Sequence, residues 1–489
     1  MIEKYFPIER TASMKRFSWY DYITINIYWF GLTAVSQSNG LIQPLLIQRF
    51  VSPEQQGTFY GNMRLYSLMV ALLVQALAGM LSDRSMAKWG KRRPYILVGT
   101  LLNITALIAI GASPTYWFLF GGAVFSQVAS NIAHGANQGL IPDLIPEDRR
   151  GRFSGVKALM ELFPVIIIAL TIGPLIAKGH MWTGIAVQVS LLFVAMLITM
   201  LVKEEPLTEK PDPLDWKPFG RLVAMTLVFM VAILLSGEIV QWIGNNLDES
   251  SPMTNHLITM GLVGLAGMAA AVILGVWGSI QISVGREIIE KNPSFVWWVI
   301  NRLAFLVGAN NLSTFAVYFI QGRLGFSGDE AAGPASQLKL VVGVLILAFA
   351  YPSGWLADKI GRKLLLSISG ILATVGTIIL LLSPTMTVIM IGGCIVGAAI
   401  GVFFTTNWAL GTDIVPKKDA GKFLGISNLA GAGAGAVGAY IGGPIADYFT
   451  TNYPQTPGLG YMLIFAIYGA LFLISSIVLI KVQEQLKFA

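Results

Sequence analysis

The 489-residue sequence contains little cysteine, histidine or charge, and each shortage excludes a class of protein. Cys394 is the one cysteine, which excludes a disulfide within the chain and a metal site built from several cysteines. The three histidines, His134, His180 and His256, are scattered, which argues against a metal centre. Charged residues make up 12% of the chain, about half the share usual in soluble proteins. So few charges cannot cover the surface of a soluble protein of this length.

Apolar residues, in contrast, make up 55% of the sequence, and the mean hydropathy is +0.67. A helix needs about 20 apolar residues to cross a bilayer. The first apolar stretch is too long for the core of a cleavable signal, so we expect it to be retained. The sequence therefore predicts an all-α polytopic membrane protein with fourteen transmembrane helices, at 22–46, 58–81, 95–112, 117–141, 156–177, 182–202, 219–243, 257–281, 296–320, 336–356, 364–382, 386–410, 423–446 and 460–480.

Lysine and arginine are distributed unevenly between the loops that this count predicts. Three of the 33 lie in loops on one side, and all others outside the spans lie on the side of the two termini. The three are Arg49, Lys178 and Arg323. By the positive-inside rule, both termini are cytoplasmic, and we expect the chain in the cytoplasmic (plasma) membrane. The net charge of +7 then requires no nucleic-acid partner.

The sequence also repeats itself. DLIPEDRRGRFSG, which begins at Asp143, recurs 270 residues later as DIVPKKDAGKFLG from Asp413. GMLSDRSMAKWGKRR, from Gly79, pairs with GWLADKIGRK, from Gly354. Two parallel six-helix repeats are the arrangement of transporters whose halves move about a site near the membrane midplane. We therefore predict a first half at 1–205, a linker with an inserted helix pair at 206–294, and a second half at 295–489.

The second pair of loops, with the pattern Gly-x-x-x-Asp followed by Gly and two basic residues, resembles the signature of the major facilitator superfamily. The fuller string SDRSMAKWGKRRPYI is similar to loops of glycoside–pentoside–hexuronide:cation symporters and plant-type sucrose transporters. The inserted pair departs from both groups and is found in fourteen-helix drug exporters and peptide symporters. The resemblance implies a conformational latch on the cytoplasmic side, unless the basic run only fixes topology. The latch residues would be Asp83, Arg84, Gly90, Arg92, Asp358, Gly361 and Arg362.

Ionisable groups inside a membrane span are expensive and therefore mark candidate functional sites. His134 and Glu161 lie at equal depth, roughly 14 Å from the cytoplasmic ends of their spans. Such a pair is a candidate site for proton coupling. A structural hydrogen bond between packed helices and direct substrate binding are the alternatives. Lys339 lies near a span end, where an interfacial position is expected.

Other polar residues within the spans are candidates for contact with substrate. Amides, hydroxyls and aromatic rings suit an uncharged, hydroxylated ligand, although hydrogen bonds between helices explain them equally well. Arg64 would favour an anionic substrate if it faced the cavity; the alternative is that it extends to the membrane surface. The set is Gln37, Asn39, Gln43, Arg64, Gln127, Asn131, Gln138, Arg302, Asn310, Asn311, Tyr318, Asn407 and Trp408.

These features predict a secondary active transporter of a small polar solute, such as a sugar or glycoside, coupled to a proton or sodium ion. The alternative is a proton-antiport exporter of amphiphilic compounds. No phosphate-binding loop, nucleophile–base set or metal set is evident, so neither an ATP-driven pump nor an enzyme is expected. We expect no cofactor, and a monomer whose partners are the solute, the ion and the lipid bilayer. A transporter-like receptor would share this fold.

Overall fold

The structure is a bundle of long helices. The computed structural model describes residues 18–211, 213–248, 250–283, 285, 292–414 and 420–483, and it has no strand in this part of the chain. The first half contains α1 (Trp19–Ile47), α2 (Gln56–Ser82), α3 (Arg93–Gly111), α4 (Tyr116–Gln138), α5 (Leu140–Leu144), α6 (Glu147–Leu170), α7 (Ile172–Ala177) and α8 (Met181–Thr199). The second half contains α12 (Pro293–Thr314), α13 (Ala316–Leu324), α14 (Ala332–Ile360), α15 (Arg362–Leu382), α16 (Met386–Ile414), α17 (Ala420–Asn452) and α18 (Leu459–Val478).

Local sequence explains where several helices begin and break. Ser18 and Asp21 form a capping box at the start of α1. The Thr115 hydroxyl accepts the Phe118 N–H, at 3.3 Å, at the start of α4. Pro174 removes an N–H donor and crowds the carbonyl four residues earlier, so α6 ends at Leu170 and α7 begins beyond Thr171. A second break, at Phe315, bends α13 by 58° from α12.

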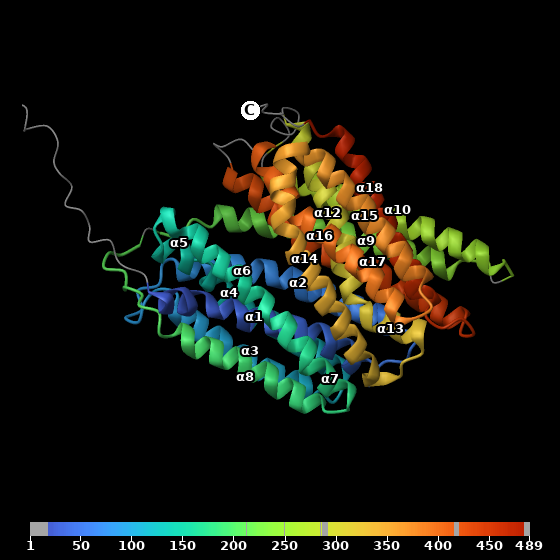
Figure 1. Ribbon diagram of the computed structural model, residues 1–489, viewed down its shortest axis with the longest axis horizontal. Coiled ribbons are helices and arrows are strands. Elements are labelled where there is room, and N and C mark those ends of the chain that lie inside the picture. Colours follow the sequence, from blue (N-terminus) through green and yellow to red (C-terminus); the bar gives the residue numbers. More distant parts are fainter. Residues whose placement is uncertain are drawn as a thin grey trace, which may run out of the picture.

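The helix neighbours of the first half recur in the second half. α3 packs on α4 as α15 packs on α16, and α2 packs on α4 as α14 packs on α16. α1 contacts α6 and α8, and at the corresponding positions α12 contacts α17 and α18. The repeat in the sequence thus has a counterpart in helix packing, and Figure 1 shows the two groups inclined to each other.

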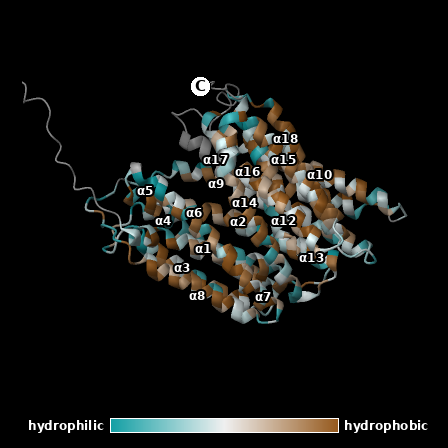
Figure 2. Ribbon diagram, in the orientation of Figure 1, coloured by the Kyte–Doolittle hydropathy of each residue, from teal (hydrophilic) through white to brown (hydrophobic). Residues whose placement is uncertain are grey.

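The number of membrane spans is confirmed only in part. Within the described residues, ten helices are long and apolar enough to cross a membrane, or eleven if the bent pair α12–α13 is one span. α1 and α4 are absent from this number because they carry runs of amides and hydroxyls, and α17 is described only in part. The all-helical fold with long apolar helices is confirmed, while the number of fourteen spans remains a prediction. Apolar residues cover the lengths of the helices in Figure 2, with hydrophilic residues near their ends.

Two further helices, α9 (Lys217–Asn245) and α10 (Met253–Ser283), pack on each other and beside α17 and α18. Their outward side chains are large and apolar: Leu235, Trp242 and Leu262 are at least 60% exposed. These two helices therefore present a surface that is compatible with lipid, while α9 also contacts α2 of the first half.

α2 and α17 pack backbone to backbone where the two halves meet. A Cβ atom added to Gly57 would stand 2.6 Å from the Gly443 carbonyl oxygen, closer than real Cβ contacts allow. One added to Gly61 would collide with the carbonyl of Ala439. Small residues on both helices allow this close approach.

Candidate transport cavity

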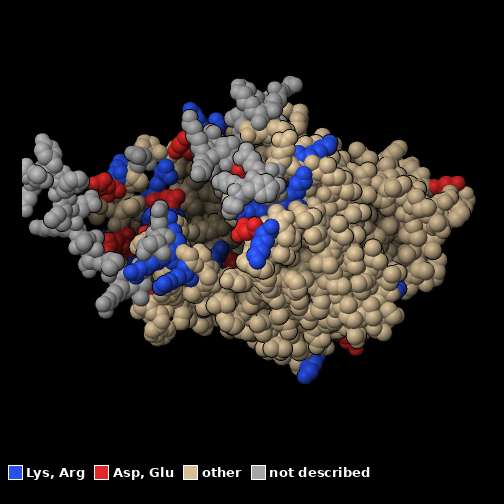
Figure 3. All heavy atoms as spheres, turned by 45° about the horizontal axis from the view of Figure 1, so that its top comes forward, with Lys and Arg blue, Asp and Glu red and all other residues tan. Residues whose placement is uncertain are grey.

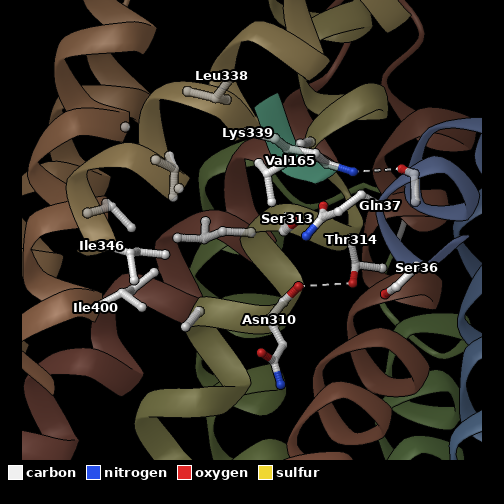
Figure 4. A pocket seen from close by; sticks show the side chains of 18 of the residues that line it. Ser36, Gln37, Val165, Asn310, Ser313, Thr314, Leu338, Lys339, Ile346 and Ile400 are labelled. Carbon is white, nitrogen blue, oxygen red and sulfur yellow. Dashed lines mark hydrogen bonds between the residues drawn. The ribbon is translucent and has the colours of Figure 1, made fainter. Parts of the chain in front are cut away.

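A cavity of about 570 Å³ lies between the two halves, within the usual size of small-molecule sites. Its walls come from α1, α2 and α6 of the first half and from α12, α14 and α16 of the second. One wall is polar, with amides and hydroxyls of Ser36, Gln37, Asn310, Ser313 and Thr314 (Figure 4). The cavity therefore offers hydrogen bonds to a solute that enters it.

The facing wall is apolar. Leu338 and Ile346 of α14 and Ile400 of α16 point toward the space in Figure 4. Val165 of α6 joins them. A solute with one polar and one apolar side would match both walls.

Three side chains of the charged residue types line the cavity: Arg64, Glu161 and Lys339. Lys339 Nζ donates to the Gly40 carbonyl oxygen at 2.9 Å, across the two halves (Figure 4). The expectation that Lys339 is interfacial is thus wrong, because α14 turns this side chain toward α1 and away from the membrane surface. Arg64 Nε is buried and has no hydrogen-bond partner in the described part of the chain. Arg64 therefore faces the cavity and does not extend outward.

Glu161 forms an ion pair with Lys157, one turn earlier on α6, with Oε1 3.4 Å from Nζ. Lys157 Nζ also stands 3.8 Å from the centre of the Trp29 ring of α1, a cation–π contact. The other neighbour of Trp29 is His134, whose ring lies edge-on at 5.1 Å. His134 bonds to Gln138 at 3.2 Å. His134 and Glu161 thus contact different members of the Trp29–Lys157 pair, and among the described residues they form no hydrogen bond or ion pair with each other.

The predicted substrate contacts separate into two groups. Gln37, Arg64 and Asn310 line the cavity. The remaining candidates do not line it, and most have partners within their own half. They are Asn39, Gln43, Gln127, Asn131, Gln138, Arg302, Asn311, Tyr318, Asn407 and Trp408.

Several members of the second group connect neighbouring helices. Gln188 of α8 donates to Asn39 of α1 at 2.9 Å. Asn311 donates to the Ala434 carbonyl of α17 at 3.1 Å. These bonds are the interhelical alternative that the sequence left open.

Arg302 and Asn407 belong to a buried network inside the second half. Arg302 Nη1 donates to Asn407 Oδ1 at 2.8 Å, and Asn407 donates to Asn301 Oδ1 at 3.0 Å. The Arg302 guanidinium also lies 5.5 Å from the centre of the Trp408 ring. This network holds α12 against α16 and does not reach the cavity.

Hydrogen bonds between the halves gather at the end of the bundle that holds the α1–α2 loop, which we call the outer end. Gln48 and Gln321 exchange bonds of 2.7 and 3.1 Å, and the Tyr318 hydroxyl donates to the Pro44 carbonyl at 2.9 Å. Arg49 pairs with Asp329 at 3.7 Å. The cavity is therefore closed at the outer end.

Asp447 of α17 makes a further closing contact. Its carboxylate accepts the N–H groups of Gly57 and Thr58 at 2.8 and 2.6 Å. These are first-turn N–H groups of α2, whose own N-cap residue, Gln55, provides no side-chain cap. A side chain of the second half thus caps a helix of the first, which a reading of local sequence could not find.

The opposite, basic end holds the predicted latch residues in two similar networks. Arg92 pairs with Asp83 and, at 2.9 Å, with Asp143. Arg362 pairs with Asp413 and, at 3.3 Å, with Asp358. The loop glycines Gly90 and Gly361 have φ of +109° and +94°, which favours glycine. Arg84 Nη1 approaches the Met80 carbonyl oxygen at 3.4 Å.

Each network ties loops of one half together, and the latch role itself remains a prediction. Asp143 and Asp413, which begin the repeated loop sequences, were not expected to bind these arginines. The Glu204 carboxylate also accepts the Arg92 N–H at 2.9 Å. In Figure 3 the surface between the halves is hollowed at the basic end, with charged residues around the rim. The structure is thus closed at the outer end and open at the basic end.

Two groups of helices with corresponding neighbours, arranged around a central cavity, are typical of membrane transporters with repeated halves. The model of the Major Facilitator Superfamily matches residues 20–320 and 298–487, and the chain belongs to this superfamily. A nucleoside transporter, NupG, has the same fold, with a TM-score of 0.64 at 12% identity over 95% of this chain and 100% of that one.

Sequence relatives include sugar transporters, as the loop motif predicted. A segment of 132 residues is 30% identical to the galactose-proton symporter of Escherichia coli (strain K12), over 26% of this chain and 28% of the relative. A segment of 50 residues is 44% identical to a sucrose transport protein of Oryza sativa subsp. japonica, over 10% and 9%. The chain aligns with less than a third of the length of the curated relatives it matches.

Proposed function

We propose that the chain is a secondary active transporter that moves a sugar or glycoside by alternating access, coupled to a proton. The observation that carries this proposal is the cavity between the halves, with a polar wall of amides and hydroxyls. Closure at the outer end and the hollow at the basic end correspond to one of the two states that alternating access requires. The sugar transporters among the relatives support the same class of substrate.

Glu161 is the residue we propose as the proton carrier. It is the one carboxylate among the described residues that line the cavity. When Glu161 is ionised, its charge is balanced by Lys157 at 3.4 Å; when it is protonated, Lys157 retains the Trp29 ring as a partner. Lys157 therefore keeps at least one of its present partners whether Glu161 is ionised or protonated, and neither state requires a new contact. His134, whose ring contacts Trp29 edge-on, is a second candidate.

Internal pH in dye-loaded proteoliposomes would test both parts of this proposal. We expect that a mono- or disaccharide added outside will acidify vesicles that contain the wild-type protein. The Glu161→Gln variant should lose acidification. Glu205→Gln, which removes an exposed carboxylate outside the cavity, is the matched control and should behave like the wild type.

The possible outcomes test the coupling ion and the substrate class separately. Sugar entry without acidification, and dependent on sodium, would contradict proton coupling but keep sugar transport. Acidification that survives in Glu161→Gln would place the proton elsewhere, with His134→Gln as the next variant. Absence of entry for every sugar tested, with folded protein, would contradict sugar transport.

The apolar wall favours a second candidate, a proton-antiport exporter of amphiphilic compounds. Leu338, Ile346 and Ile400 offer contact area that a bare sugar does not need. Efflux of an amphiphilic dye driven by an imposed pH gradient, without any sugar effect, would favour this candidate.

A further inference from the structure

The cavity contains two cationic side chains, Arg64 and Lys339, that form no ion pair with any described residue. Arg64 forms neither a hydrogen bond nor an ion pair with the described residues, and its buried Nε is unsatisfied. Lys339 Nζ bonds to a neutral group, the Gly40 carbonyl. Both side chains line the same cavity.

The cavity carboxylate does not compensate these charges. Glu161 is paired with Lys157, so the local balance on α6 is already neutral. An ionisable side chain without a counter-ion is costly inside a membrane protein, even when it is only partly buried, and such side chains mark a ligand or ion site. The missing partner is therefore expected to arrive with the solute.

Other groups show where such a partner would bind. The Arg64 Nη2 and Asn310 Nδ2 atoms both lie within 4.0 Å of the position of a Cβ on Gly435 of α17. Lys339 and Gln37 come from the facing elements α14 and α1 (Figure 4). Donors from both halves thus surround the polar side of the cavity, while α14 and α16 supply the apolar side.

We propose that the transported solute carries an oxyanion, bound by Arg64 and Lys339, and an apolar group that rests on Leu338, Ile346 and Ile400. This proposal rests on the proposed transport function and narrows its substrate class to amphipathic glycosides with an acidic group. Because Lys339 is hydrogen-bonded across the halves, the anion would also replace the Gly40 carbonyl as its partner.

Isothermal titration calorimetry with the purified protein at pH 7 tests this proposal with three probes. Phenyl β-D-glucuronide carries a carboxylate at the position where phenyl β-D-glucopyranoside carries a hydroxymethyl group. Benzoate has a carboxylate and a ring without the sugar. We expect the glucuronide to bind about tenfold or more tightly than the glucoside, because hydrogen bonds to charged groups exceed neutral ones by this amount.

Charge-removing variants identify the residues responsible. Arg64→Gln and Lys339→Gln should each reduce the preference for the glucuronide about tenfold, whereas Arg64→Lys, which keeps the charge, should retain most of it. Lys178→Gln removes one exposed charge at the outer end, outside the cavity, and should leave the preference unchanged.

The remaining outcomes overturn the proposal. Equal affinity for the two glycosides, or a preference that survives in both Gln variants, contradicts the anion site and leaves sugar transport intact. Binding of benzoate but of neither glycoside supports the anion site and contradicts the sugar function. If none of the three probes binds to folded protein, both proposals fail.

Discussion

Arg92 and Arg362 form the same contacts in very different surroundings. The Arg92 side chain is 5% exposed, whereas the side chains of Arg362 and Asp413 are 25% and 47% exposed. Removal of one partner of a buried pair leaves an uncompensated charge, while exposed pairs contribute up to about 1 kcal/mol. Asp143→Ala should therefore lower the free energy of unfolding by about 2–3 kcal/mol, and Asp413→Ala by less than about 1 kcal/mol. Thermal denaturation of both variants in one detergent checks this difference, and equal losses would contradict it.

Glu204, beyond the end of α8, should make stability depend on pH. Burial raises the pKa of Glu204 above its ordinary 4.5, against the opposing effect of the Arg92 and Arg93 N–H groups. A raised folded-state pKa means that folding favours the protonated form, so this contribution is present at low pH and is lost as the pH rises through the folded-state pKa. Relative to Glu204→Gln, the wild type should thus lose thermal stability as the pH is raised from 4 toward neutral. A constant difference in melting temperature over this range would contradict the assignment.

Sequence alone located the depth of a residue in its span but not the direction in which its side chain points. His134 and Glu161 were expected to meet because their depths agree. Instead, His134 packs edge-on against Trp29 of α1, and Glu161 pairs with Lys157. Lys339 was placed at the interface because it lies near a span end, yet the rotation of α14 directs it to Gly40. The direction of a side chain depends on helix rotation and on neighbouring helices, which no local pattern in one sequence encodes.

At the scale of the helix, α2 depends on α17 for its cap. Asp447→Ala removes two hydrogen bonds to a carboxylate and should weaken closure of the outer end by about 1–2 kcal/mol. The population of outer-open molecules should rise roughly five- to thirtyfold. Spin labels attached at Ser52→Cys and Asn452→Cys, in a Cys394→Ser background, measure the distance across the outer end. A larger outer-open population would appear as a larger share of long distances between the two labels. Asp248→Asn, an exposed carboxylate in the α9–α10 loop, is the control, and an unchanged distance distribution in Asp447→Ala would contradict the cap.

Helix positions were the most accurate part of the sequence prediction, because apolar length is read directly from the residues. The break at Thr171 follows from Pro174, which the sequence shows. The break at Phe315 has no proline or glycine beside it, so only the tertiary structure reveals it. The cap by Asp447 also escaped prediction, because its partners are 390 and 389 residues away.

At the scale of the whole molecule, alternating access requires the outer end to close and open. A methyl group at Gly61 would collide with the Ala439 carbonyl and hold α2 away from α17. Gly61→Ala should therefore lower the initial rate of uptake in proteoliposomes about tenfold. An increase of about 1.4 kcal/mol in the free energy of closing the outer end is enough for a change of this size. Gly121→Ala is the matched control, because no atom lies within 4 Å of the added group. Equal rates in the two variants would contradict a closing role for the glycine contact.

The contact between Asp447 and α2 also affects the order of biosynthesis. The ribosome makes Gly57 and Thr58 nearly 400 residues before the carboxylate that binds their N–H groups. The arginine networks of the basic end, in contrast, each bring together loops of a single half. The first half can thus complete its basic end while the second is still being translated, but the first turn of α2 waits for α17. The cap of α2 therefore forms only after most of α17 has been made, and nascent chains that end before Asp447 should leave the first turn of α2 more accessible to proteases.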